Sequence, residues 1–170
     1  LQTDELIASL LDQVKTVLPY ETGTLWLRQG NQTTIRAARG FEDSEERVGL
    51  SVAVEDSVLL REMINTGRPI AVADVRQDER FPALMETRYL SWLGAPLIVK
   101  GEVVGVIALE KSEANFYNPE RIQTAITFAG QAAVALENAN LFQESSRRAL
   151  ELDQRSQRLA LLNRLSTELS

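Results

Sequence analysis

The sequence contains no cysteine and no histidine in 170 residues. The absence of thiols excludes disulfide bonds, thiolate nucleophiles and cofactors attached through a thioether. The absence of imidazoles excludes histidine acid–base catalysis, and the two absences together remove the usual zinc ligands and the histidine ligand of haem. Only carboxylate metal sites remain, and no carboxylates show the spacing of a calcium-binding loop. We therefore expect no metal centre.

Long apolar runs and clustered positive charge are also missing. No stretch approaches the length of a membrane-spanning helix and no signal peptide opens the chain, so we expect a cytoplasmic protein without membrane contact. The net charge of -6 argues against a nucleic-acid surface, which would need a basic face. The composition, 44% hydrophobic and 25% charged, fits one globular domain with an appendage. Because the chain opens with Leu1 rather than methionine, we expect a fragment of a longer protein.

The most informative stretch runs from Trp92 to Lys111 and predicts two apolar strands joined by a Lys-Gly-Glu turn. From Val103 to Leu109, apolar residues occupy both alternating faces, interrupted only by Gly105. A strand with one face in water would alternate apolar and polar residues instead. We therefore expect this hairpin to be covered by helices on one face and, on the other, by loops that enclose a cavity.

Hydrophobic periodicity and capping residues predict the elements around this hairpin. In chain order we expect a helix over 3–18, a hairpin with strands 24–28 and 33–38, an acidic mobile segment over 41–51, a helix over 57–66, a strand over 70–73, and a long connection over 74–91. Asp56 or Ser57 is expected to cap the middle helix, and Gly67 to end it in the left-handed conformation.

The last helix is expected to begin at Asn118-Pro119 and to continue unbroken to Ser170. It is small and apolar over 125–139, which suits close packing against a sheet. Over 144–158 it is mostly polar, and a lone helix of this kind is hardly stable in water. A sparse seven-residue repeat follows, formed by Leu152, Leu159, Leu162 and Leu169. The repeat favours a dimeric coiled coil, and the alternative is the first helix of a following domain.

This order of elements resembles the GAF domain, a relative of the PAS fold, over residues 3 to about 143. The best-matching pieces are APLIVKGEVVGVIALEK, the Asn-Pro-Glu start of the last helix, and FAGQAAVALENANLF. The resemblance implies an α+β fold with a central antiparallel sheet of five or six strands in the order 2-1-5-4-3. It places the first and last helices on one face and a pocket roofed by loops on the other. It also implies a GAF sensory domain over 1–143 and a signalling helix over 144–170 that leads toward a following domain.

Family functions carry over unevenly. Members that bind cyclic nucleotides bear an Asn-Lys…Phe-x-x-x-Asp-Glu signature, and the matching positions here are Glu110-Lys111…Phe116-x-x-x-Glu120-Arg121. The first and last positions depart from the signature, which argues against a cyclic nucleotide. By the resemblance, Lys111 and Glu120 form an ion pair between the last strand and the helix. The lack of cysteine and histidine rules out a covalent bilin, a histidine-ligated haem and a thiol-based methionine sulfoxide reductase.

Six residues are candidates for contact with a ligand in the implied pocket: Asp74, Arg80, Phe81, Tyr89, Trp92 and Glu110. Asp74 or Arg80 could anchor a polar group of the ligand. Alternatively, Asp74 caps a helical turn, Arg80 is solvated and Phe81 plugs the sheet. Tyr89 and Trp92 either stack on a flat ligand or fill the cavity themselves, and the same choice applies to Trp26.

Glu110 ends a strand that is apolar on both faces, so it could be a pocket carboxylate with a raised pKa. We favour the alternatives, in which it is exposed at the strand end or pairs with Arg36 or Lys111.

The expected function is that of a non-catalytic module. It senses a small molecule, forms a homodimer through its terminal helices and relays a signal to an output domain of the sensor kinase or cyclase type. No pair of residues has the spacing of an acid–base couple, so we expect no enzymatic activity in this chain. The alternative is a purely structural, dimerising module whose pocket is filled by its own side chains and takes no ligand.

Overall fold

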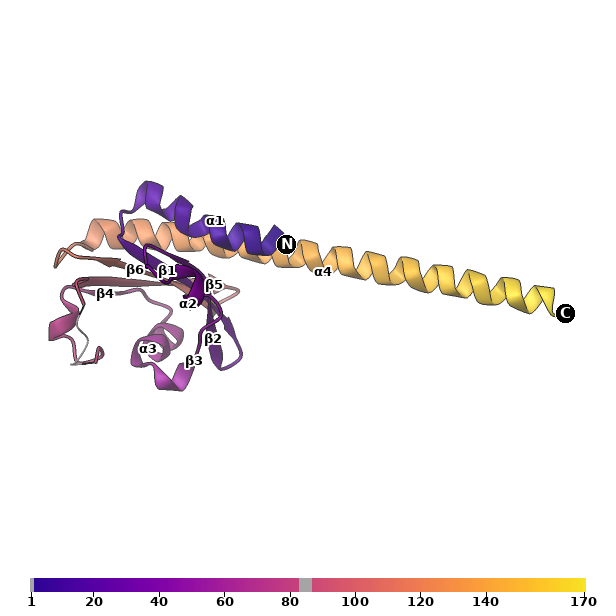
Figure 1. Cartoon of the computed structure of the whole chain (residues 1–170), viewed down its shortest axis with the longest axis horizontal. Coiled ribbons are helices and arrows are strands. Elements are labelled where there is room, and N and C mark those ends of the chain that lie inside the picture. Colours follow the sequence, from indigo (N-terminus) through magenta and orange to yellow (C-terminus); the bar gives the residue numbers. More distant parts are fainter. Residues whose placement is uncertain (1, 83–86) are drawn as a thin grey trace. The chain divides into compact units, whose positions relative to one another are not determined.

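A six-stranded antiparallel sheet forms the centre of the computed structural model, which describes residues 2–82 and 87–170. The strands lie in the order β3-β2-β1-β6-β5-β4 (Figure 1). Without β3 this is the predicted order 2-1-5-4-3, which is therefore confirmed. The strands are β1 (Thr22–Gln29), β2 (Gln32–Arg39), β3 (Ser51–Ala53), β4 (Ile70–Val72), β5 (Ser91–Val99) and β6 (Glu102–Lys111).

The chain separates into two units of internal contact, residues 1–136 and 137–170. The sheet and the start of the last helix belong to the first unit. The helices are α1 (Gln2–Val17), α2 (Ser44–Arg47), α3 (Val58–Thr66) and α4 (Pro119–Glu168), and two 3-10 turns, η1 (Val54–Asp56) and η2 (Val75–Gln77), lie between them.

One face of the sheet, called here the α1/α4 face, is covered by α1 and the beginning of α4 (Figure 1). Helix α4 contributes a row of small residues to this core: Ala125, Ala129, Ala132 and Ala133. Their spacing of three and four residues puts them on one side of the helix, and their small side chains let the helix backbone approach the sheet closely. Leu25, Leu93 and Leu109 of the sheet fill the same core. The expected packing of both terminal helices on one face is confirmed.

The opposite face, called here the pocket face, is covered by α3 and by connecting segments. Leu60 and Met63 of α3 pack there with Trp92, Val106 and Ala108 of the sheet. Because Val106 and Ala108 alternate with residues of the α1/α4 core along β6, the strand is buried on both sides. This confirms the expectation drawn from its continuous apolar run.

Helix ends follow the capping residues closely. Ser57 accepts a hydrogen bond from the backbone nitrogen of Leu60 at the start of α3, and Gly67 ends that helix with φ of 64°. Asn118 Oδ1 accepts from the backbone nitrogen of Arg121 at the start of α4. These caps confirm the predicted boundaries because each one satisfies a backbone group that the helix itself leaves unpaired.

The segment over 41–51, for which the sequence predicts an acidic, mobile stretch, contains short elements that were not predicted. It holds the short helix α2, and the edge strand β3 begins at its end, pairing with the start of β2. The backbone nitrogen of Ile35 donates to Leu50 and that of Gly49 donates to Ile35, which fixes the segment beside β2. Elements of three or four residues are too short to show a period in the sequence. The strand β3 is held in place by its pairing with β2, and the residues before it are held by their hydrogen bonds to Ile35.

The ion pair expected between Lys111 and Glu120 is also corrected. Within the described residues, Lys111 Nζ instead lies 3.9 Å from Glu21 and 4.8 Å from the centre of the Phe116 ring. The guanidinium of Arg121 lies 3.9 Å from the same ring. The residues that match the family signature therefore join β6 to α4 through cations around Phe116, since a positive charge is attracted to the face of an aromatic ring.

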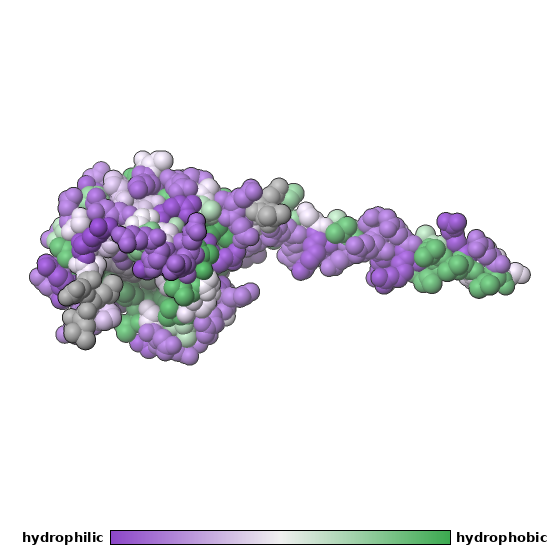
Figure 2. Space-filling model, in the orientation of Figure 1, coloured by the Kyte–Doolittle hydropathy of each residue, from purple (hydrophilic) through white to green (hydrophobic). Residues whose placement is uncertain are grey.

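The second unit lies almost entirely within α4, which is a single helix of 50 residues ending at Glu168. Figure 2 shows apolar side chains gathered toward the C-terminal end of α4, after a largely hydrophilic stretch. These leucines are exposed: Leu152, Leu159, Leu161, Leu162, Leu165 and Leu169. Within the described residues, none of the helices combines the length and the apolar character that a membrane crossing requires.

Candidate functional site

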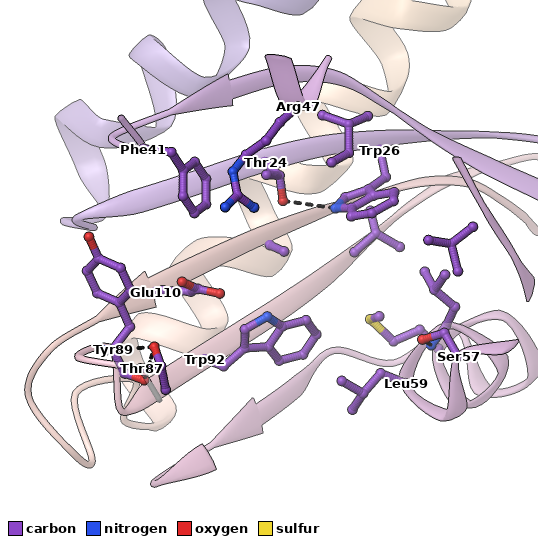
Figure 3. A pocket seen from close by; sticks show the side chains of 16 residues that line it. Thr24, Trp26, Phe41, Arg47, Ser57, Leu59, Thr87, Tyr89, Trp92 and Glu110 are labelled. Carbon is purple, nitrogen blue, oxygen red and sulfur yellow. Dashed lines mark hydrogen bonds between the residues drawn. The ribbon is translucent and has the colours of Figure 1, made fainter. Parts of the chain in front are cut away.

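A pocket of about 390 Å³ lies on the pocket face of the sheet. The strands β1, β5 and β6 supply its floor, α3 supplies one wall, and the segments around α2 and before β5 form its rim (Figure 3). Its lining residues are Thr24, Trp26, Ile35, Phe41, Arg47, Val52, Ser57, Leu59, Leu60, Met63, Thr87, Tyr89, Trp92, Val106, Ala108 and Glu110. Most of these side chains are apolar, and the few polar ones are spread around the opening, as in small-molecule sites.

Two indole rings line the pocket. Trp26 is held by a hydrogen bond of 2.9 Å from its Nε1 to Thr24 Oγ1. Trp92 is buried, and Phe81 meets its ring edge-on with 5.7 Å between the ring centres. Both rings are fixed by neighbours that lie beside the cavity, and the cavity remains open between them (Figure 3). The aromatic side chains therefore line the space without filling it.

Glu110 brings a carboxylate to this largely apolar site. Its Oε2 accepts a hydrogen bond of 2.8 Å from Thr22 Oγ1, whereas Oε1 has no hydrogen-bond partner within the described residues. Burial raises the pKa of Glu110, and the Thr22 hydrogen bond and the charge of Arg47 act in the opposite direction. The favoured expectation of an exposed or paired Glu110 is wrong. The sequence could not reveal this, because the burial depends on a roof built from distant segments.

The two expected partners of Glu110 are engaged elsewhere. Arg36 Nη2 lies 2.7 Å from Asp4 Oδ1, and the ion pair of Lys111 is with Glu21. Glu110 is therefore left as a half-buried carboxylate at the edge of the pocket floor.

Arg47, which no sequence motif marks as a site residue, supplies a positive charge to the rim. Its Nε donates to Asp43 Oδ1 at 2.7 Å, and its guanidinium lies 4.0 Å from the centre of the Phe41 ring. In Figure 3 its nitrogen atoms point toward the same open space as the Glu110 carboxylate. In the sequence this arginine follows a run of acidic residues, a pattern that an ion pair with a nearby acid such as Asp43 explains without any role in a pocket.

Tyr89 and Thr87 close the pocket on the side of β5. Thr87 Oγ1 accepts from the backbone nitrogen of Tyr89 at 3.1 Å, and the Tyr89 hydroxyl accepts from Arg88 Nη2 at 2.6 Å. Both side chains are drawn beside Glu110 in Figure 3. Tyr89, Trp92 and Glu110 are thus the three predicted site residues that the fold brings together around one cavity.

The other three predicted residues do not line this pocket. Asp74 caps η2, where it accepts from the backbone nitrogen of Arg76 at 3.0 Å and pairs with the same side chain. The pKa of Asp74 is lowered by this arginine. Phe81 packs against Trp92 from the connection. These arrangements match the alternative roles of turn cap and sheet plug.

Arg80 joins the connection to α3. Its guanidinium lies 2.7 Å from Asp78 Oδ2 and 2.8 Å from Glu62 Oε2, and Glu62 belongs to α3. The hydrogen bond to Asp78, with the further bond to Glu62 and the charges of both acids, raises the pKa of Arg80, and the hydrogen bond from Arg80 lowers the pKa of Asp78. Arg80 is therefore a link between two segments beside the pocket, and each of its three side-chain nitrogens already donates to an acidic side chain.

Without cysteine and histidine, carboxylates are the principal metal-binding side chains of this chain. In the part of the chain that the structure describes, no three acidic side chains gather in a metal-binding arrangement. The charged groups of the pocket, one arginine and one carboxylate among aromatic rings, instead suit an organic molecule.

The sequence model of the GAF domain family matches residues 1–137. A search of curated proteins gives no match. Among solved structures, a GAF domain/HD domain protein from Geobacter sulfurreducens is similar with a TM-score of 0.72 and 13% identity, over 82% of this chain and 94% of that chain.

Two further structures extend the comparison. A domain of a putative two-component sensor histidine kinase from Sinorhizobium meliloti 1021 has a TM-score of 0.65 and 21% identity, covering 85% of this chain and 97% of its own. The phycocyanobilin-bound GAF domain from a cyanobacterial phytochrome has a TM-score of 0.69 and 17% identity, covering 83% and 87%. At these identities the likeness shows the fold.

Proposed function

Because the chain belongs to the GAF domain family, we propose that it is a non-catalytic sensory module that binds a small molecule in the pocket lined by Trp26, Trp92 and Glu110. The observation that carries this proposal is the open cavity of about 390 Å³ beside a half-buried carboxylate, one oxygen of which has no partner among the residues that the structure describes. A buried charge of this kind weakens the fold unless a partner compensates it, so a ligand is its natural complement.

The same strands support a route from the pocket to α4. β1, β5 and β6 form the pocket floor, and their alternate residues pack against the alanines of α4 on the other face. A ligand that prefers one arrangement of roof and sheet would therefore favour one position of α4 on the sheet. The size of this effect is limited by the difference in ligand affinity between the two arrangements.

The second unit supports dimerisation. Leu152 and Leu159 repeat after seven residues on α4, as do Leu162 and Leu169, which follows the last residue of α4, and all four side chains are exposed. A second copy of the chain would cover this seam in a coiled coil. The signal would then pass along the paired helices to an output domain of the sensor kinase or cyclase type, in a cytoplasmic protein. The similarity to a domain of a putative sensor histidine kinase agrees with such an output.

Ligand binding is tested by thermal unfolding against a library of nucleotides, organic acids, amines and aromatic compounds. A ligand of the folded state raises the unfolding temperature by mass action, and the shift grows with ligand concentration. Ala108→Leu, which extends a side chain into the cavity, serves as the matched variant and should lose the shift. No shift across the library would favour the alternative of a purely structural, dimerising module.

Dimerisation is tested by light scattering on the full chain. Leu159→Lys places a charge in the proposed seam and should convert a dimer into a monomer. Leu161→Lys adds the same charge to an equally exposed position outside the seam and should leave the dimer intact. A monomeric unmodified chain, or equal effects of the two substitutions, would contradict this part of the proposal.

A further inference from the structure

The pocket presents two opposite charges that do not pair with each other. Arg47 and Glu110 both line it, and Figure 3 shows their charged groups turned toward the same open space. Their ion-pair and hydrogen-bond partners within the described residues are Asp43 and Thr22 respectively. Opposite charges that share a cavity without meeting leave room for a molecule that contacts both.

Each of the two groups is held on one side and open on the other. Thr22 occupies Oε2 of Glu110 and leaves Oε1 as an acceptor. Asp43 occupies Nε of Arg47, and Phe41 supports the guanidinium plane, which leaves the two terminal nitrogens as donors. Groups held in this way lose little conformational entropy when a ligand binds. More of the free energy of their contacts with the ligand therefore appears as affinity.

The uncharged lining residues indicate that the part of the ligand between its charged groups and the pocket wall is apolar. Trp26 and Trp92 offer ring faces, and Leu60, Met63 and Val106 add aliphatic surface. A purely anionic ligand would satisfy Arg47 but leave Glu110 without a partner and would be repelled by it. A purely cationic ligand would satisfy Glu110 but would leave Arg47 without a partner and would be repelled by it. Unpaired charged groups in a low-dielectric site oppose binding, so the site discriminates against both.

We propose that the ligand is a small zwitterion with an apolar body, of the class of α-amino acids with aromatic or aliphatic side chains. This inference rests on the proposed ligand-binding function. The ammonium group donates to Glu110 Oε1, the carboxylate accepts from the terminal nitrogens of Arg47, and the side chain lies between the two indole rings. The volume of about 390 Å³ admits a molecule of this size.

The test is calorimetric titration of the full chain with phenylalanine, leucine, methionine and tryptophan, each compared with its decarboxylated amine and its deaminated acid. A charged hydrogen bond of this type is expected to change affinity by about tenfold or more, so each truncated compound should bind at least that much more weakly than its parent amino acid. Neutral heterocycles such as uracil, which offer a donor and an acceptor without charge, form the competing set.

Three variants assign the contacts. Glu110→Gln should weaken the amino acid about tenfold and leave the deaminated acid unaffected or tighter, because only the ammonium contact is lost. Arg47→Gln should do the reverse, weakening the acid and sparing the amine. Arg61→Gln removes an equally charged but exposed side chain of α3 and should bind as the unmodified chain does. Circular dichroism of each variant verifies that it is folded, and Arg47→Lys, which retains the charge, should keep part of the affinity.

Several outcomes overturn the zwitterion. Binding of neutral heterocycles in place of amino acids would contradict it while leaving the ligand-binding function intact. Equal affinity for the amino acid, its amine and its acid would do the same. If no amino acid binds at millimolar concentration, the zwitterion is wrong, and the wider thermal library then decides separately whether the pocket takes any ligand.

Discussion

The strands β1, β5 and β6 send alternate side chains to two faces that are packed in different ways. On the α1/α4 face, Leu25, Leu93 and Leu109 are at most 1% exposed and meet a row of alanines. On the pocket face, Trp92 and Ala108 border a cavity that also holds a carboxylate. The same strands thus supply a filled core on one side and an open site on the other.

The α1/α4 face therefore contributes mainly to the stability of the fold, whereas the pocket face leaves space in which a ligand can bind. Close-packed interiors resist any change of volume, because surrounding atoms cannot move to fill or vacate space. A face with an existing cavity has room to accommodate such changes. We therefore expect equal substitutions on the two faces to have unequal effects, and a comparison of matched pairs tests whether the pocket face is as open as it is in the structure.

The largest difference is expected for leucine truncation. Leu109→Ala on the α1/α4 face should lower the free energy of unfolding by about 2–5 kcal/mol, because it removes buried surface and leaves a new cavity. Leu60→Ala on the pocket face should cost about 2 kcal/mol or less, because Leu60 already borders an open space. Urea denaturation of the two variants measures both values. Equal losses would show that the pocket face is as tightly packed as the other.

Enlarging an alanine gives the converse pair. Ala95→Leu on the α1/α4 face should destabilise the chain by about 1–3 kcal/mol through overpacking. Ala108→Leu directs the same added atoms into the pocket and should cost less than about 1 kcal/mol. Thermal and urea unfolding check the two values. An Ala108→Leu variant as unstable as Ala95→Leu would contradict the open cavity.

A smaller effect is expected at the link between the connection and α3. Arg80 pairs with Asp78 and Glu62, and it is partly exposed, so Arg80→Gln should lower the free energy of unfolding by about 1 kcal/mol. The matched change Arg76→Gln removes an arginine whose one ion pair among the described residues is with nearby Asp74, and it should alter local order less. Hydrogen exchange in α3 distinguishes them, since only loss of Arg80 should speed exchange there. Unchanged exchange in α3 would contradict the linking role.

The elements that could be predicted from sequence are those fixed by local chemistry. Ser57, Gly67 and Asn118 determine helix ends through their own side chain or backbone freedom, and the apolar run in β6 requires cover on both sides. The strand order was predicted from the family resemblance. β3 and α2 could not be predicted, because they are short, and β3 also depends on pairing with β2.

The candidate site was less predictable for a related reason. Aromatic residues such as Trp92 could be assigned to a pocket or a core, and both assignments use the same sequence signal. Glu110 was expected to be exposed or paired, because strand position alone does not show how much of a side chain a distant roof covers. Arg47 lay in an acidic segment and gave no sign that it faces Glu110 across the pocket. Charges that tertiary structure brings to one cavity from distant segments leave no pattern in the sequence.

The smallest effect, and the one that increases stability, is expected from Glu110→Gln. Burial raises the pKa of Glu110 above that of an unfolded chain, so the folded state binds the proton more readily. The stability that this group contributes is present below the unfolded pKa of about 4.3 and is lost as the pH rises through the folded pKa. Gln cannot ionise and still accepts from Thr22, so the variant should be slightly more stable than the unmodified chain at pH 7.

Two neighbours bear on this titration. The charge of Arg47 favours the ionised carboxylate and reduces the effect, whereas Tyr117, whose pKa is raised by burial, stays neutral over the range. Urea unfolding of both proteins from pH 4 to pH 8 measures the difference, which should be close to zero at the acidic end and should increasingly favour Gln as the pH rises. A difference of the opposite sign would mean that the ionised carboxylate stabilises the fold. Glu110 would then have a structural role, although it lines the pocket. The expected sign means that the open face retains a carboxylate that weakens the fold, which is reasonable only if that carboxylate binds something.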